Sequence, residues 1–193
     1  MTPRALTIIR DEHQAIAAVL HALGHLVRGI RDGARPDFQA LRALVFYIDA
    51  YPERLHHPKE TEHLFARLRE RSPQASGVLD QLDDEHALGE RETMQLEHLL
   101  LEYEMLGATR MEPFANALEA FTRGYLEHMQ IEEQEVLPLA SEVLTATDWA
   151  MIDTAFAANR DPLTGHPPEE EFAQLFRQIV NLLPPPLGVG PTH

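Results

Sequence analysis

Cysteine is absent from the 193 residues of the chain. Disulfide frameworks, thiolate metal sites, iron–sulfur clusters and cysteine nucleophiles are therefore excluded together. Any metal ion that the protein binds must be held by nitrogen and oxygen ligands.

Long apolar runs are also lacking. No stretch approaches the roughly 20 consecutive apolar residues that a membrane-spanning helix needs. Residues 1–13 reach charged side chains before they build the apolar run of a signal peptide. We therefore expect a cytoplasmic protein.

Positive charge is scarce, because 16 lysine and arginine residues stand against 31 aspartates and glutamates, for a formal net charge of -15. This excess repels phosphate backbones and anionic lipid surfaces. The densest basic stretch, Arg67, Arg69 and Arg71, is too small to offset it and is better interpreted as a solvated helix end. We expect neither nucleic acid nor a membrane as a partner.

Apolar residues recur at helical spacing along almost the whole chain, and no stretch alternates with period two between hairpin turns. The pattern predicts an all-α protein. Four long helices are expected at about residues 5–30, 38–71, 73–106 and 111–140. We expect them to form an up-down four-helix bundle over residues 1–145. Because proline removes a backbone donor, a kink or break is expected near Tyr51 and Pro52.

Two shorter helices are expected after the bundle, at about residues 147–158 and 168–182. The tail from Pro184 to His193 is predicted to be irregular. We expect residues 146–193 to form a helical extension packed on the bundle, with Trp149, the only tryptophan, as its anchor.

Four of the eleven histidines recur in an ordered pattern. Two of them, 73 residues apart, each end an Asp-Glu-His triplet. The other two, 72 residues apart, each have a glutamate four residues on. The residues are His13 and His86, His56 with Glu60, and His128 with Glu132. Such a repeat indicates two copies of a helix pair related by pseudo-twofold symmetry.

These six residues continue the apolar faces of their helices, as His13 does between Ile9 and Ile16. Burying four imidazoles and two carboxylates together costs free energy unless they are paired or bind something. Because residues i and i+4 share a helix face, a histidine can bind one ion while its glutamate reaches a second. Nitrogen and oxygen ligands without sulfur favour iron, with manganese or zinc as weaker alternatives. The pattern predicts a non-haem di-iron centre that holds two iron ions.

The four long helices contain four His-x-x-x-Glu pairs, where about one is expected by chance. The pair His98–Glu102 lies about 120° around its helix from His86, and we interpret it as a solvated surface pair. His63 shares the face of His56 and is interpreted as an outer hydrogen-bond partner or a core histidine.

These residues resemble the hemerythrin-like family, also called the HHE cation-binding domain, whose members are four-helix bundles with a di-iron centre. The segments that carry the resemblance are D-E-H-Q-A-I from 11, H-H-P-K-E from 56, E-H-A-L-G-E from 85 and H-M-Q-I-E-E from 128. The resemblance implies one iron on His13 and His56, the other on His86 and His128, and bridges from Glu60 and Glu132.

Glu90 is a departure from the oxygen-carrying members of that family, which have a second histidine four residues after the first on the third helix. The pattern is closer to bacterial proteins that repair iron centres after nitrosative damage, and to iron or oxygen sensors. Glu90 can bind the second iron in place of the missing imidazole, and His57 is an alternative. We rank Glu90 higher because it lies on the face of His86, whereas His57 is turned about 100° from His56.

The leading hypothesis is a metal-binding protein that senses or binds oxygen or nitric oxide, or that stores, delivers or repairs iron. The alternative is a di-iron oxidoreductase that reduces oxygen or peroxide, or oxidises ferrous iron. A purely structural bundle would leave the repeat of ligand types unexplained. No nucleophile elbow, Walker-type loop or dinucleotide fingerprint supports a hydrolase, kinase or dehydrogenase.

Overall fold

The computed structural model describes residues 2–167, 170–183, 185 and 188, which contain helices and no strand. The long helices are α1 (Arg4–Arg31), α2 (Phe38–Ile48), α5 (Ser76–Leu106) and α6 (Met111–Ile131). The shorter ones are α3 (His57–Lys59), α4 (Ala66–Arg71), α7 (Leu137–Val143), α8 (Ala146–Phe156) and α9 (Ala173–Leu182). The all-α prediction is confirmed.

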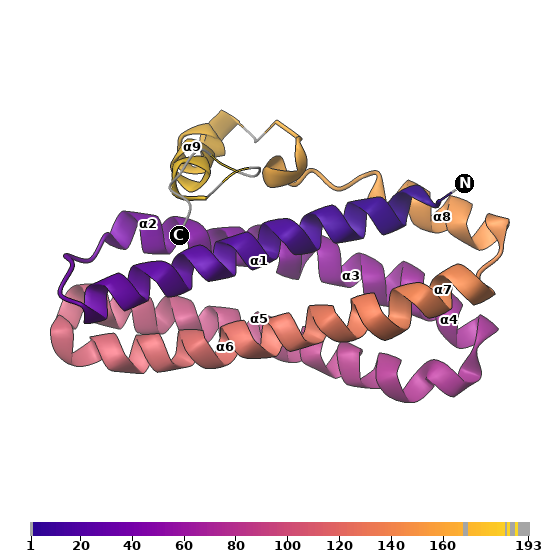
Figure 1. Cartoon of the computed structure of the whole chain (residues 1–193), viewed down its shortest axis with the longest axis horizontal. Coiled ribbons are helices and arrows are strands. Elements are labelled where there is room, and N and C mark those ends of the chain that lie inside the picture. Colours follow the sequence, from indigo (N-terminus) through magenta and orange to yellow (C-terminus); the bar gives the residue numbers. More distant parts are fainter. Residues whose placement is uncertain (1, 168–169, 184, 186–187, 189–193) are drawn as a thin grey trace.

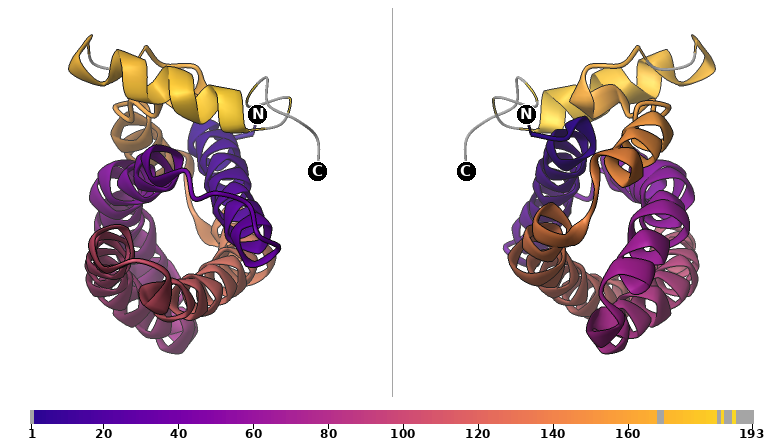
Figure 2. Two further views of the ribbon diagram at one scale, coloured as in Figure 1. Left: turned by 90° about the vertical axis from the view of Figure 1, so that its left-hand side faces the viewer. Right: turned by 90° about the vertical axis from the view of Figure 1, so that its right-hand side faces the viewer.

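Four helical rods lie side by side, and successive rods run in opposite directions (Figure 1). α1 and α5 are rods by themselves, α2 to α4 form the second rod, and α6 with α7 forms the fourth. α1 and α5 each pack against both α2 and α6. The end-on views show the four rods around a common axis (Figure 2).

The second and fourth rods change their helical geometry along their length. Asp49–His56, Glu60–Phe65 and Glu132–Val136 are π-helical, with wider turns than the α-helices beside them. The rod therefore continues through Pro52 as a π-helical segment, where the sequence led us to expect a kink or break. Such segments occur often at functional sites, and these three contain or adjoin predicted ligands.

The core consists of two apolar clusters with a polar layer between them. Along α1, Ile9 belongs to one cluster and Ile16 to the other, and His13 lies between them. Along the fourth rod, Tyr125 belongs to the cluster of Ile16 and Val136 to the cluster of Ile9. The buried polar residues of the layer include His13, His56, His57, Glu60, His128 and Glu132. The layer thus has apolar packing on both sides along the length of the bundle.

The C-terminal helices pack against the first two rods. α8 contacts α1 and contributes Trp149, Ile152 and Phe156 to the apolar cluster that contains Ile9. α9 contacts α2 and ends at Leu182, as the sequence predicted, but it begins at Ala173 after a short 3₁₀ turn. Residues 168 and 169 of the predicted helix, and nearly all of the predicted irregular tail, lie outside the described residues. None of the described helices is long and apolar enough to cross a membrane.

Asp148 stabilises the start of α8 in two ways. Its carboxylate accepts hydrogen bonds from the Thr145 backbone N–H at 2.9 Å and from Arg71 at 2.9 and 3.0 Å. The Thr145 hydroxyl in turn accepts from the Asp148 backbone N–H at 3.3 Å. We expect Asp148→Ala to lower the free energy of unfolding by about 1–2 kcal/mol in urea denaturation. Thr145→Ser, which keeps the capping hydroxyl, should stay within about 0.5 kcal/mol of the wild type. Equal losses in the two variants would contradict this role.

Candidate metal centre

Two histidine pairs meet in the polar layer, each formed across two rods. The Nε2 atoms of His13 and His56 lie 3.2 Å apart, and those of His86 and His128 lie 3.1 Å apart. Each pair joins one histidine from an Asp-Glu-His triplet with one from a His-x-x-x-Glu motif. This is the pairing that the resemblance to the hemerythrin-like family implied.

Glu60 and Glu132 lie between the two pairs, and each contacts one histidine of each pair. A Glu60 oxygen lies 3.3 Å from His56 Nε2 and 3.6 Å from His86 Nε2. Oxygens of Glu132 lie 3.3 Å from the Nε2 atoms of His13 and His128. Both carboxylates therefore face both halves of the layer.

Neither carboxylate has a hydrogen-bond partner, although Glu60 is 0% and Glu132 is 1% exposed. A buried carboxylate without compensation carries a large desolvation cost. Two groups of four ligand atoms, each within 4.8 Å of one another, share these carboxylates: His13, His56, Glu60 and Glu132, and Glu60, His86, His128 and Glu132. The donor set of imidazole nitrogens and carboxylate oxygens fits bound cations.

The outer nitrogens of two histidines face glutamates of the repeated triplets. His56 Nδ1 lies 2.7 Å from a Glu12 oxygen, and His128 Nδ1 lies 2.8 Å from a Glu85 oxygen. A carboxylate at this position holds the proton on Nδ1 and leaves the Nε2 lone pair free for a metal ion. Glu12 and Glu85 were not predicted as functional residues, although each is the middle residue of an Asp-Glu-His triplet.

The other two histidines are held by the residues that follow Glu60 and Glu132 in the chain. His13 Nδ1 lies 3.0 Å from Glu133, and His86 Nδ1 lies 3.0 Å from the Thr61 hydroxyl. All four imidazoles thus turn Nδ1 outward and Nε2 inward. Facing Nε2 lone pairs at 3.1 to 3.2 Å repel each other unless a proton or a metal ion lies among them.

Asn159 brings the C-terminal extension into contact with this arrangement. Its side-chain amide donates to both Glu12 oxygens, at 2.7 and 3.0 Å, while its carbonyl oxygen accepts from Lys59. Asn159 is 3% exposed. It lies 147 residues from Glu12 in the chain and belongs to no motif, so no signal in the sequence identified it.

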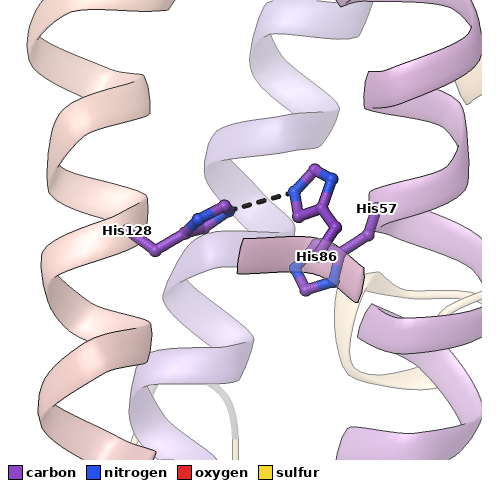
Figure 3. A group of neighbouring side chains, drawn as sticks. All are labelled: His57, His86 and His128. Atoms are coloured by element: carbon purple, nitrogen blue, oxygen red, sulfur yellow. Dashed lines mark hydrogen bonds between the residues drawn. The ribbon is translucent and has the colours of Figure 1, made fainter. Parts of the chain in front are cut away.

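The burial of Glu90 and His57 is the opposite of what their helix faces led us to expect. Glu90 is exposed and belongs to none of the three possible ligand groups. His57 is 5% exposed and forms the third group with His86 and His128. Figure 3 shows these three rings gathered from α3, α5 and α6. The structure thus places His57, and not Glu90, beside the other histidines, and the ligand role of Glu90 stays a prediction.

The remaining histidine interpretations concern His98 and His63. His98 contacts Glu102 at 3.3 Å, and its side chain is 71% exposed, which confirms the solvated pair. His63 is half-buried and belongs to none of the three groups.

Burial controls the ionisation of this layer. It raises the pKa of Glu60, and the charge of Glu132 raises it further. It also disfavours the charge of Glu132, but contacts with His128 and His13 outweigh burial and keep the pKa of Glu132 low. Burial lowers the pKa of His86 to about 2. Without a cation, the layer therefore resists holding both carboxylates charged.

A cavity of about 320 Å³ between α5 and α6 reaches one half of the centre. Its lining includes His57, His86, Tyr125 and His128, whereas neither His13 nor His56 contributes to it. The small residues Gly89, Ala120 and Gly124 in the lining leave this space open. Three glutamates that are half-buried or exposed also line it: Glu85, Glu92 and Glu127.

The metal-free protein should lose stability above neutral pH through His128. Burial disfavours its charge, but contacts with Glu132 and then Glu85 outweigh burial and raise its pKa to about 9. A raised folded pKa gives a contribution that is complete below the unfolded value of 6.5 and is lost as the pH rises through 9. We expect urea denaturation with chelator present to show this loss. His13 and His56 also have raised pKa values and act in the same direction.

Glu85→Gln isolates the part of this effect that belongs to His128. Without the Glu85 charge, the pKa of His128 should fall and the loss of stability should begin at lower pH. The same pH dependence in Glu85→Gln and wild type would contradict this assignment.

The hemerythrin HHE cation binding domain is the family whose model matches this chain, over residues 4–140. Comparison with curated proteins and with solved structures found no significant match. The matched segment contains all six residues that face the shared centre, and it leaves α8, α9 and Asn159 outside. The chain therefore belongs to the hemerythrin HHE cation-binding domain family.

Proposed function

We propose that this centre holds two iron ions, one between His13 and His56 and the other between His86 and His128. The observation that carries the proposal is the pair of buried carboxylates without hydrogen-bond partners, each in contact with one histidine of each pair. Imidazole and carboxylate without thiolate is a donor set that suits iron. Within this proposal, the four rods are the up-down four-helix bundle of the family.

We further propose that a small uncharged molecule, oxygen or nitric oxide, reaches the half of the centre that His86 and His128 hold. The cavity between α5 and α6 adjoins these two histidines. The glutamates in its lining disfavour anions. When bound, the iron ions would supply redox chemistry and open coordination positions, while the protein orients the imidazoles through their Nδ1 partners.

Metal analysis of protein from iron-supplemented expression tests the first proposal. We expect about two irons per chain in the wild type. His56→Ala and His128→Ala should each lower the iron content, because each removes one imidazole and leaves its central glutamate without that contact. His98→Ala, which alters an exposed pair of the same i, i+4 spacing, is the control and should keep the wild-type content. Absence of metal from the wild type, or unchanged content in the first two variants, would sink the proposal.

An optical spectrum of the same protein, recorded before and after reduction and after exposure to oxygen or nitric oxide, tests the second. A spectral change that saturates with added gas supports a binding protein or sensor. Continuing consumption of oxygen, peroxide or ferrous iron would instead identify the oxidoreductase alternative. No change with either gas would contradict gas binding.

Asn159 should affect metal affinity although it contacts no proposed ligand. It holds Glu12, which in turn faces His56 Nδ1. Loss of such an outer partner typically weakens metal binding about 10–100-fold. We expect a loss in this range for Asn159→Ala, measured by competition with a chelator. Asn181→Ala, on the exposed side of α9, is the control. Equal affinity in Asn159→Ala and wild type would show that the extension plays no part in the centre.

A further inference from the structure

We propose that His57 is a fifth imidazole ligand at the metal position of His86 and His128, so that the two positions are unequal. This inference rests on the proposed function. Nitrogen atoms of His57, His86 and His128 lie within 4.8 Å of one another (Figure 3). The His57 ring stacks on that of His86, with centroids 4.1 Å apart and an interplanar angle of 15°. The ring is therefore held in place beside the His86–His128 pair.

His57, like the four other histidines, has a hydrogen-bond partner at Nδ1. Its Nδ1 faces a carboxylate oxygen of Glu53 at 3.3 Å, while its Nε2 lies 3.1 Å from the Tyr125 hydroxyl. That hydroxyl also lies 3.0 Å from the other Glu53 oxygen. Tyr125 has one hydroxyl proton, which it can donate to Glu53. With that hydrogen bond directed to Glu53 and the imidazole proton on Nδ1, the Nε2 lone pair of His57 is free for a metal ion.

The residues around Glu53 make room for this arrangement. Gly89 lies inside α5, where glycine costs about 1 kcal/mol relative to alanine. A Cβ atom at Gly89 would lie 3.2 Å from each carboxylate oxygen of Glu53. Glycine therefore lets Glu53 lie against α5 in reach of His57. Gly89 also occupies the buried position one turn after His86, which leaves Glu90 exposed.

The internal repeat of the sequence is broken at His57. His57 follows the ligand His56, and the equivalent residue after His128 is Met129. Met129 is buried and lies in the wall of a surface pocket that also includes His13. A thioether is a soft ligand that suits iron with nitrogen and oxygen donors poorly. One position can thus take three imidazoles, whereas the other takes two.

Titration of the metal-free protein with Co²⁺ under anaerobic conditions tests the inference, because Co²⁺ absorption reports its coordination. The wild type should bind in two steps of unequal affinity. His57→Phe keeps a stacking ring and removes both nitrogens, so it should weaken one step at least about tenfold and change its absorption. Tyr125→Phe removes only the hydroxyl and should keep both steps. His63→Ala, in the same rod, is the control.

Each outcome separates the inference from the proposed function. If the wild type binds neither Co²⁺ nor iron, the proposed function fails, and the inference fails with it. If His57→Phe keeps the affinities and absorption of the wild type, only the inference is overturned. Equal weakening by Tyr125→Phe and His57→Phe also overturns it, because His57 would then act through its hydrogen bonds alone. Circular dichroism checks folding, and His57→Gln replaces His57→Phe in the titration if that variant does not fold.

Discussion

Two carboxylates buried without hydrogen-bond partners, Glu60 and Glu132, are the constraint on which the rest of the structure depends. Apolar clusters on both sides keep water away from them, which makes their charge costly. Four imidazole nitrogens face them, and all four imidazoles are held from outside through Nδ1. This arrangement makes chemical sense around cations, which would relieve both the carboxylate desolvation and the repulsion between inward lone pairs.

The internal repeat extends beyond the ligands to the residues that hold them. Glu12 and Glu85 hold histidines across the bundle in equivalent ways, and Thr61 and Glu133 follow the two central glutamates. Matched outer partners give the two halves similar imidazole orientations. The halves then differ in access and in further partners, because the cavity lies beside His86 and His128 while the C-terminal extension supports His56 through Glu12.

The π-helical segments explain how one rod can bring several neighbouring residues into the polar layer. A π-helix advances by wider turns, so the angle between neighbouring side chains differs from that of an α-helix. His56 ends one such segment and Glu60 begins the next, with His57 in the short α3 between them. His56 and His57 can therefore both be buried in the polar layer. His56 lies beside His13, and His57 lies beside His86 and His128.

The sequence by itself determined the all-α class and the repeat that sets His13, His56, His86 and His128, with two glutamates, on the inner faces of their helices, because helix periodicity and a repeated spacing are local properties. Only the tertiary structure shows that His57, and not Glu90, lies beside the other histidines. Neighbouring side chains of an α-helix are turned by about 100°, but this angle does not hold beside the π-helical turns around His56 and His57. In α5 the buried face passes through Gly89 and leaves Glu90 exposed. The tertiary structure also brings Asn159 to Glu12, since a hydrogen bond across 147 residues depends on how the extension packs and leaves no periodic pattern in the chain.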